Sequence, residues 1–178
     1  MVCLQQNEEI GMKILHTPIS DEDIRNLKVG DMVYITGEIF CGRDAVLPKI
    51  CKLIDEGKLE QSGIDLQGSV IFHTAVSPAG VGPTSSNKLE IEGSFQKLSE
   101  AGVKIHLGKG AIGNDTIQQL DDHNAAFAVI PPVTALLGNN TQSQKCVAFP
   151  ELGMEAFYEL DVKEYPCIIA AVHNESIY

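Results

Sequence analysis

The stretch Ser69-Val70-Ile71-Phe72-His73-Thr74-Ala75-Val76, followed by Gly82-Pro83-Thr84-Ser85-Ser86-Asn87-Lys88, decides the fold class of this chain. β-Branched and aromatic residues that give way to Pro and Gly predict a buried strand that ends in a loop. The loop carries three hydroxyl side chains and one amine, and it leads into a helix expected to begin at Leu89. Such a Gly-rich turn can hold an anion through its backbone N–H groups, but an ordinary turn with a Ser or Thr helix cap fits the same residues.

Two further predicted strands end in a glycine and a basic residue. Met32–Phe40 leads into Cys41-Gly42-Arg43-Asp44, where Asp44 is expected to cap a helix over residues 45–56. Val103–Leu107 leads into Gly108-Lys109-Gly110. Ligands of open α/β sheets bind at the carboxyl ends of the strands, so Arg43 and Lys109 are candidate binding residues. An ion pair between Arg43 and a surface acid is the competing interpretation.

The order of strands and helices predicts the architecture. Strands and helices alternate from Ser69 to Leu137, which indicates parallel strands. The two ends are richer in strand, including a hairpin with the arms Tyr158–Val162 and Cys167–Val172. We therefore expect a single α/β domain over residues 1–178, with a layered mixed sheet, helices and an antiparallel portion contributed by the ends.

Composition and charge limit the classes of function. The 178 residues are 44% hydrophobic and carry a formal net charge of −11, which fits a globular protein and argues against a nucleic-acid-binding surface. No apolar stretch reaches the ~20 residues that span a bilayer, and no secretory signal is recognised. The histidines are expected at strand ends or on the surface. The cysteines form no metal-binding pattern, so we expect reduced thiols, no metal site and a cytoplasmic location. The cysteines are Cys3, Cys41, Cys51, Cys146 and Cys167.

Four side chains near the strand ends make a candidate anion site. If the strands are parallel, Arg43, Lys88 and Lys109 lie at one edge of the sheet. The Thr84 hydroxyl would lie between them. Cations for the carboxylates, with a hydroxyl and loop amides for the remainder, suit a small dicarboxylate. The sequence shows no Ser-His-Asp order, P-loop or paired carboxylates, so we infer a half-site whose electrophile comes from elsewhere.

Short motifs give the chain a resemblance to a known family, from about Leu15 to Ala171. They occur in the family's order: Val29-Gly30-Asp31, Ile35-Thr36-Gly37, Gly42-Arg43-Asp44-Ala45, Gly82-Pro83-Thr84-Ser85-Ser86, Gly108-Lys109-Gly110, Gly153-Met154-Glu155-Ala156 and Tyr165-Pro166. The chain resembles the β subunit of class I, iron–sulfur-dependent fumarate hydratases, or the C-terminal domain of their single-chain forms. The L(+)-tartrate dehydratase β subunit is equally similar.

The resemblance implies a fold, a reaction and a partner. The fold is the swivelling β/β/α domain, and the reaction is reversible addition of water to a small dicarboxylate of the fumarate/malate or tartrate type. A [4Fe-4S] cluster is expected on an α partner subunit, where one iron acts as a Lewis acid, and none on this chain. The chain is thus expected to be a hydro-lyase subunit active only with its partner, in a hetero- or homo-oligomer.

The resemblance also implies roles for the site residues. The family's proton-exchanging threonine falls on Thr84 and its GKG lysine on Lys109, and these two are the catalytic candidates. The substrate-binding candidates are Arg43, Lys88, Ser85 and Ser86.

Three positions depart from the family pattern. Asn87-Lys88 replaces Gly-Arg, Leu47-Pro48 stands where a His is usual, and Pro131-Pro132-Val133 replaces a Gly-Gly-Ala run. Lys cannot make the forked contact of Arg. The departures suggest a divergent member with another small hydroxy-diacid substrate, or one with impaired catalysis. The alternative is a non-catalytic anion-binding or assembly module that kept the fold.

Overall fold

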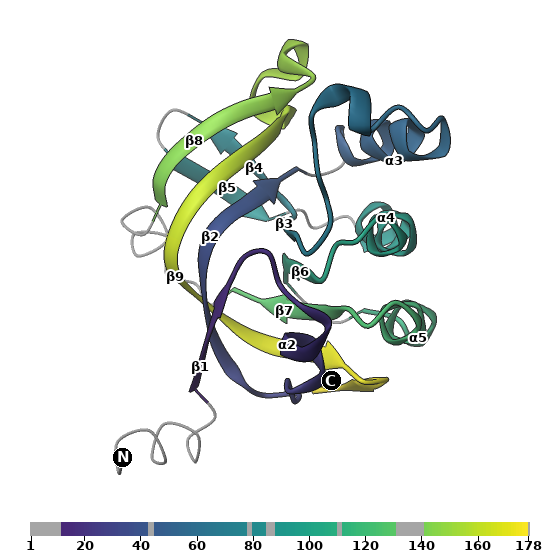
Figure 1. The fold of residues 1–178 in the computed structure, drawn as a ribbon, viewed down its shortest axis with the longest axis vertical. Helices are drawn as coiled ribbons and strands as arrows, with labels where there is room; N and C mark the ends of the chain where they lie inside the picture. Colours follow the sequence, from purple (N-terminus) through teal and green to yellow (C-terminus); the bar gives the residue numbers. More distant parts are fainter. Residues whose placement is uncertain are drawn as a thin grey trace.

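A ring of five strands lies at the centre of the fold (Figure 1). The computed structural model describes residues 12–42, 45–77, 80–84, 88–109, 112–130 and 141–177. Within them, β2, β3, β6, β7 and β9 pair in that order, and β9 pairs again with β2. The strands of the main sheet are β1 Met12–His16, β2 Met32–Cys41, β3 Val70–Phe72, β6 Ile105–Gly108, β7 Ala126–Val129, β8 Thr141–Ala148, β9 Phe157–Val172 and β10 Glu175–Ser176.

Strand directions agree with the prediction for the middle of the chain. β2, β3, β6 and β7 are parallel neighbours, and β9 closes the ring by pairing antiparallel with both β2 and β7. β8 and β10 also pair antiparallel with β9. The predicted antiparallel portion at both ends is correct for the C-terminal strands only, because β1 pairs parallel with β2.

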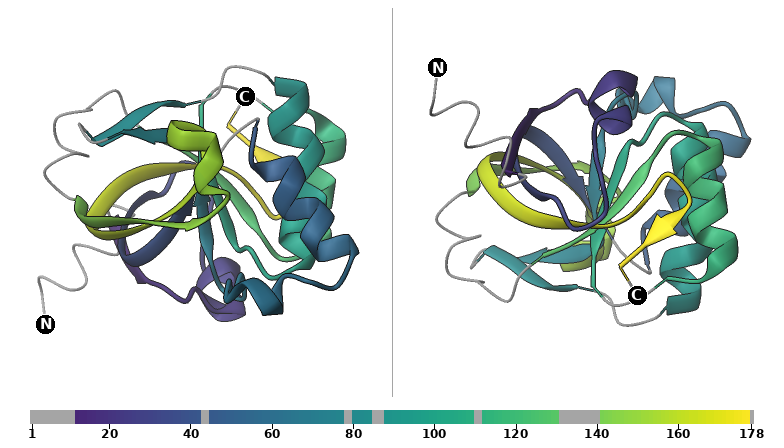
Figure 2. Two further views of the ribbon diagram at one scale, coloured as in Figure 1. Left: turned by 90° about the horizontal axis from the view of Figure 1, so that it is seen from above. Right: turned by 90° about the horizontal axis from the view of Figure 1, so that it is seen from below.

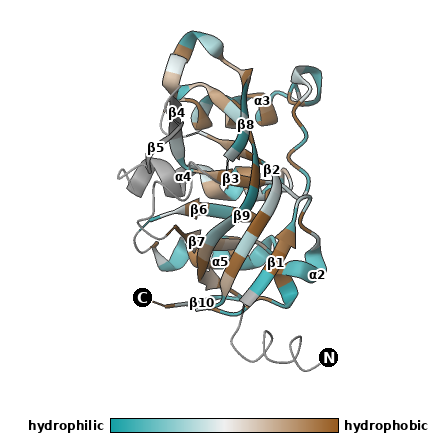
Figure 3. Ribbon diagram, turned by 90° about the vertical axis from the view of Figure 1, so that its left-hand side faces the viewer, coloured by the Kyte–Doolittle hydropathy of each residue, from teal (hydrophilic) through white to brown (hydrophobic). Residues whose placement is uncertain are grey.

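Helices cover one side of the ring. Figure 2 shows α3, α4 and α5 side by side on that side, while Figure 3 shows the opposite side, formed by β8, β9, β2 and β1. No described helix is both long and apolar enough to cross a membrane. The helices are α2 Asp21–Arg25, α3 Leu47–Asp55, α4 Lys88–Glu100 and α5 Asn114–Asp122, with 3₁₀ turns at Glu60–Ser62 and Pro150–Glu155.

Alternate residues of each ring strand face different cores, because side chains in a strand point to opposite sides in turn. In β3, Val70 and Phe72 join the cluster inside the ring. Ile71, between them, packs in the cluster beneath α3 and α4. Phe127 of β7 packs with Ile117 of α5 in a third cluster. The ring is therefore filled on the inside and covered by helices on one outer side.

The hairpin predicted near the C-terminus is wrong. β9 is one strand of 16 residues that runs through Lys163-Glu164-Tyr165-Pro166. A bulge accommodates the irregular residues: the register with β2 shifts between Ile35 and Gly37, and Glu164 has φ 52°. The Glu164 N–H donates to the Thr36 hydroxyl at 3.0 Å. The residues Lys163-Glu164-Tyr165-Pro166, which predicted the turn of a hairpin, form a bulge within one strand.

Two other local predictions are corrected near the candidate site. The predicted loop before Thr84 contains a strand, because β5 Gly80–Thr84 pairs antiparallel with β4 Thr74–Ser77. The predicted cap of α3 by Asp44 is also wrong, since Val46 occupies the N-cap without a side-chain hydrogen bond. Pro48 lies in the first turn of α3, where its missing N–H leaves one donor fewer to cap.

Candidate active site

Three parallel strands end at the same edge of the ring. The Gly42 N–H, just after β2, donates to the Phe72 carbonyl at the end of β3 at 3.0 Å. The His73 N–H, just after β3, donates to the Leu107 carbonyl of β6 at the same distance, 3.0 Å. The backbone therefore brings together the three positions from which the Arg43 segment, the β4–β5 hairpin and the Lys109 segment depart.

The β4–β5 hairpin carries Thr84 back to this edge. β4 begins one residue after His73, and Thr74 pairs with Thr84 in the ladder. Lys88 is the first residue of α4, and Lys109 is exposed directly after β6. The backbone of Thr84 thus lies beside the end of β3. The side chains of Thr84 and Lys88 lie outside the described part of the structure.

Three of the predicted site residues, Arg43, Ser85 and Ser86, lie outside the described residues. The convergence of Arg43, Thr84, Lys88 and Lys109 side chains therefore stays a prediction. The described backbone accounts for the strand ends on which that prediction depends. Pro131 and Pro132, one of the departures from the family pattern, also lie outside the described residues.

A buried histidine pair, His73 and His106, lies directly beneath this edge. The histidines were expected at strand ends or on the surface, and this expectation is only partly correct for the pair. His73 follows the end of β3 as expected, but it is fully buried, and His106 is fully buried within β6. His73 Nε2 lies 3.2 Å from His106 Nδ1, and His106 Nε2 lies 3.0 Å from the Ser99 hydroxyl. Burial lowers the pKa of His73 to about 3. Burial and, next, the neighbouring His73 lower the pKa of His106 well below its usual value.

One signal in the sequence could have located His106 of this pair. His106 lies between Ile105 and Leu107, both of which face the interior of the ring. Alternation therefore turns His106 to the helix-covered side, where α4 buries it. Its partner His73 could not be found this way, because their contact joins residues 33 positions apart.

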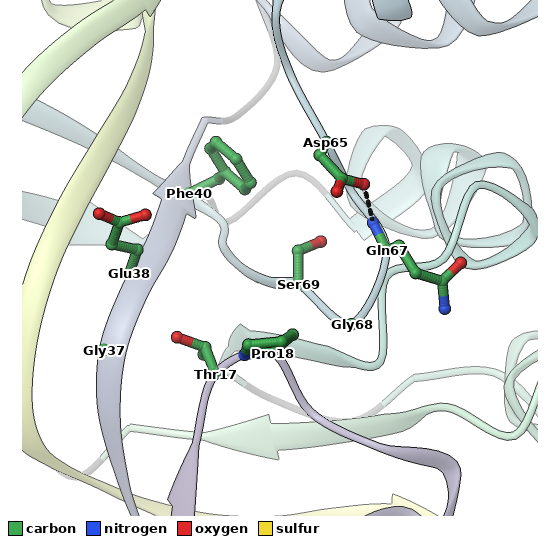
Figure 4. Close-up of a pocket in the computed structure, with 9 residues that line it drawn as sticks. All are labelled: Thr17, Pro18, Gly37, Glu38, Phe40, Asp65, Gln67, Gly68 and Ser69. Atoms are coloured by element: carbon green, nitrogen blue, oxygen red, sulfur yellow. Dashed lines mark hydrogen bonds between the residues drawn. The ribbon is translucent and has the colours of Figure 1, made fainter.

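A separate pocket of about 410 Å³ lies on another part of the ring surface (Figure 4). Ser69, just before β3, lines it, so the pocket lies at the start of that strand and the predicted site at its end. Glu38 and Asp65 supply carboxylates to the lining, which includes no Lys or Arg. A dicarboxylate would be repelled here. The lining is formed by Thr17, Pro18, Gly37, Glu38, Phe40, Asp65, Gln67, Gly68 and Ser69.

The family model described as "Fumarase C-terminus" matches residues 4–178. The chain belongs to this fumarase C-terminus family. The Escherichia coli K12 protein "L(+)-tartrate dehydratase subunit beta" is 31% identical over 173 residues, covering 90% of this chain and 82% of that protein. A Methanocaldococcus jannaschii protein, whose name includes "L(+)-tartrate dehydratase subunit beta", is 31% identical over 182 residues, covering 94% and 91%. A longer Geobacillus stearothermophilus protein, whose name includes "fumarate hydratase class I", is 30% identical over 92% of this chain but only 33% of its own length.

Leu47 packs in the apolar core of this member of the fumarase C-terminus family. Leu47 is buried in the cluster beneath α3, together with Val46 and Phe157. A Cβ added to Gly42 would lie 2.7 Å from Val46 Cγ1 and 3.3 Å from Leu47 Cδ2. The first turn of α3 thus packs directly on the segment that leads to Arg43. Leu47 thus supplies apolar bulk to the cluster beneath α3.

The described residues offer no metal centre of their own. No group of three or more His, Cys, Asp or Glu side chains among them could hold a metal ion. Cys41 and Cys167 are buried inside the ring, Cys51 lies beneath α3, and Cys146 is exposed on β8. Burial raises the pKa of Cys167 to about 12, so this thiol is protonated at neutral pH. These separated thiols do not match the ligand set of an iron–sulfur cluster.

Proposed function

We propose that this chain is the β subunit of a hydro-lyase that adds or removes water on a small dicarboxylate together with an α subunit. The observation that carries the proposal is the fumarase C-terminus match over residues 4–178, joined to relatives whose names include a tartrate dehydratase β subunit and a fumarate hydratase. The strand ends at one edge of the ring support it, because they supply a common origin for the cationic loops.

Each loop contributes one kind of contact in the proposed site. Arg43 binds one substrate carboxylate through the two-point contact that a guanidinium makes. Lys88 and Lys109 add positive charge for the second carboxylate. Thr84 exchanges a proton with the substrate, and Lys109 stabilises the charge that develops there. Ser85 and Ser86 donate hydrogen bonds to the bound carboxylates.

The electrophile in this proposal is a [4Fe-4S] cluster on the α subunit. When bound, such a cluster supplies a Lewis acid for the substrate hydroxyl and carboxylate. The separated cysteines of the described residues fit a cluster that is held elsewhere. Their free thiols also suit the cytoplasmic location that we propose. The closed ring with helices on one side supports assignment to the swivelling β/β/α fold as a single domain.

Replacement of Arg43 tests the proposed site. In the complex with the α subunit, assembled without oxygen, Arg43→Ala is expected to lose ~2–4 kcal/mol of transition-state stabilisation in kcat/KM for the hydroxy-diacid that the wild type turns over. Arg43→Lys keeps the charge without the fork and should fall between the two. Arg25→Ala, in the last turn of α2, is the control for loss of an arginine elsewhere. An Arg43→Ala enzyme with unchanged kcat/KM would refute the role of this residue.

A second function is favoured by one observation, the buried Leu47 at a position where the family usually has His. The chain would then be a non-catalytic module that binds an anion or a partner protein. Binding of a hydroxy-diacid by the anaerobic complex, without turnover of fumarate, malate or tartrate, would support this function. Turnover that depends on Arg43 would exclude it.

A further inference from the structure

The buried histidines belong to a hydrogen-bonded chain that spans three elements of the proposed site. Ser99 lies on α4, His106 on β6, and His73 between β3 and β4. The two links measure 3.0 Å and 3.2 Å. None of the three residues is more than 6% exposed. A chain of buried hydrogen bonds holds its members in fixed geometry, since breaking a link leaves a desolvated polar atom.

Each member of this chain is close in sequence to a proposed site residue. α4 carries Lys88 at its first residue and Ser99 near its end. β6 carries His106, and Lys109 follows the last residue of that strand. His73 directly precedes Thr74, which pairs with Thr84. The chain therefore connects the three segments on which Thr84, Lys88 and Lys109 depend.

Aromatic packing limits the motion of both imidazoles. The Phe95 ring stacks on His106 with centroids 4.3 Å apart and planes 21° apart, and it lies 5.0 Å from the His73 ring. Phe95 and Ser99 are four residues apart on α4, so they lie on the same face of that helix. One helix face thus both packs against the histidines and hydrogen-bonds to them.

Proton accounting shows that all hydrogen bonds of the chain run in the same sense. Both imidazoles are neutral, so each carries one N–H. Either Ser99 donates to His106 and His106 donates to His73, or every bond runs the other way. In both cases the hydrogen-bonded chain ends at His73 Nδ1, which has no hydrogen-bond partner among the described residues, and His73 directly precedes β4. Loss of the hydrogen bond between His106 and His73 therefore removes a restraint on the residue that precedes the β4–β5 hairpin.

We propose that His73, His106 and Ser99 are positioning residues that hold the Thr84 hairpin against α4 and β6. The proposal rests on the proposed function, because it gives the fixed geometry a catalytic purpose. Small displacements of a reacting group reduce kcat strongly, while substrate binding depends on other side chains. Neither histidine touches the substrate in this arrangement.

Two isosteric variants of His106 test the proposal. Asn places a polar atom where Nδ1 lies and so keeps the contact with His73, whereas Gln places one where Nε2 lies and keeps the contact with Ser99. His106→Gln should lower kcat ~10- to 100-fold with KM changed less than ~3-fold, and His106→Asn should be closer to wild type. Hydrogen exchange of the β4–β5 amides, measured on the full chain in the complex, should be faster in His106→Gln.

Leu98→Ala is the matched control. Leu98 lies beside Ser99 on α4 but packs in the cluster beneath α3, so its loss weakens the helix without cutting the chain. Equal effects of Leu98→Ala and His106→Gln on hairpin exchange would overturn the proposal. If the complex turns over no dicarboxylate, the proposed function fails, yet the exchange comparison still decides whether the network holds the hairpin.

Discussion

At the residue scale, two neutral buried histidines make the stability of the folded state sensitive to acid. Burial lowers the pKa of His73 from 6.5 to about 3, and His106 is lowered in the same direction. In the unfolded chain both side chains return to ordinary values. At pH values between the folded-state pKa and the unfolded-state pKa, the unfolded state binds more protons than the folded state. Stability therefore decreases as pH falls below about 6.5.

We expect the free energy of unfolding to fall between pH 6.5 and pH 4 by up to about 1.4 kcal/mol per pH unit for each of these histidines. Urea unfolding at a series of pH values measures this dependence. The double variant His73→Phe/His106→Phe keeps aromatic volume and should show a shallower dependence. Identical pH profiles for the two proteins would contradict neutral histidines in the fold.

Some individual residues were predictable from the sequence, and others were not. The capping box of Ser20 and Asp23 at the start of α2 is a local signal, because the two residues are only three positions apart. The strand ends before Arg43 and Lys109 were also readable, since Gly and a basic residue interrupt apolar runs. The link from His106 to His73 was not, because it depends on the parallel register of β3 and β6.

At the scale of elements, β2 and β9 form the longest pairing and share one irregularity. Gly37 of β2 has φ +121°, which L side chains rarely adopt. A Cβ placed there would lie 2.2 Å from Thr17 Oγ1. The bulge and the approach of the segment after β1 therefore both require glycine at this position.

Gly37→Ala is expected to destabilise the protein by about 2–4 kcal/mol, through strained backbone and the clash with Thr17. Gly57→Ala is the matched control, because Gly57 has φ +68° but nothing within 4 Å of an added Cβ. That control should lose only about 1–2 kcal/mol. Denaturant unfolding of both variants gives the comparison, and equal losses would show that the contact with Thr17 carries no cost.

The errors at this scale have a common cause. Pro and Gly in Gly80–Thr84 and in the middle of β9 indicate turns in an isolated sequence. In the structure, β4 pairs with the first segment and β2 with the second. Tertiary pairing overrides the local signal where a neighbouring strand is available to complete the ladder.

At the scale of the whole molecule, the chain supplies only part of the proposed site. We expect no hydratase or dehydratase turnover from the purified chain alone, because the proposed function places the Lewis-acid cluster on the α subunit. Mixing with the α subunit under anaerobic conditions should restore turnover, and exposure of that complex to air should abolish it. A spectrophotometric assay of fumarate formation or loss, with an oxaloacetate assay for tartrate, measures both. Turnover by the chain alone would refute partner dependence.

The class of architecture was predictable because alternating strands and helices require parallel pairing. The closure of the ring was not, since Met32 pairs with Ile168 and no local pattern reports a contact over that separation. The candidate site residues were predicted from motifs, and their convergence remains a prediction for the variants of Arg43 to test.

Closure by β9 has a consequence for biosynthesis. A ribosome releases β2, β3, β6 and β7 before β9, so a nascent chain exposes the open margins of β2 and β7 until residues 157–172 emerge. Unpaired margins of this kind invite association with other growing polypeptides. Productive maturation therefore depends on the translation of β9, and a pause in translation ahead of it would favour aggregates over assembled enzyme.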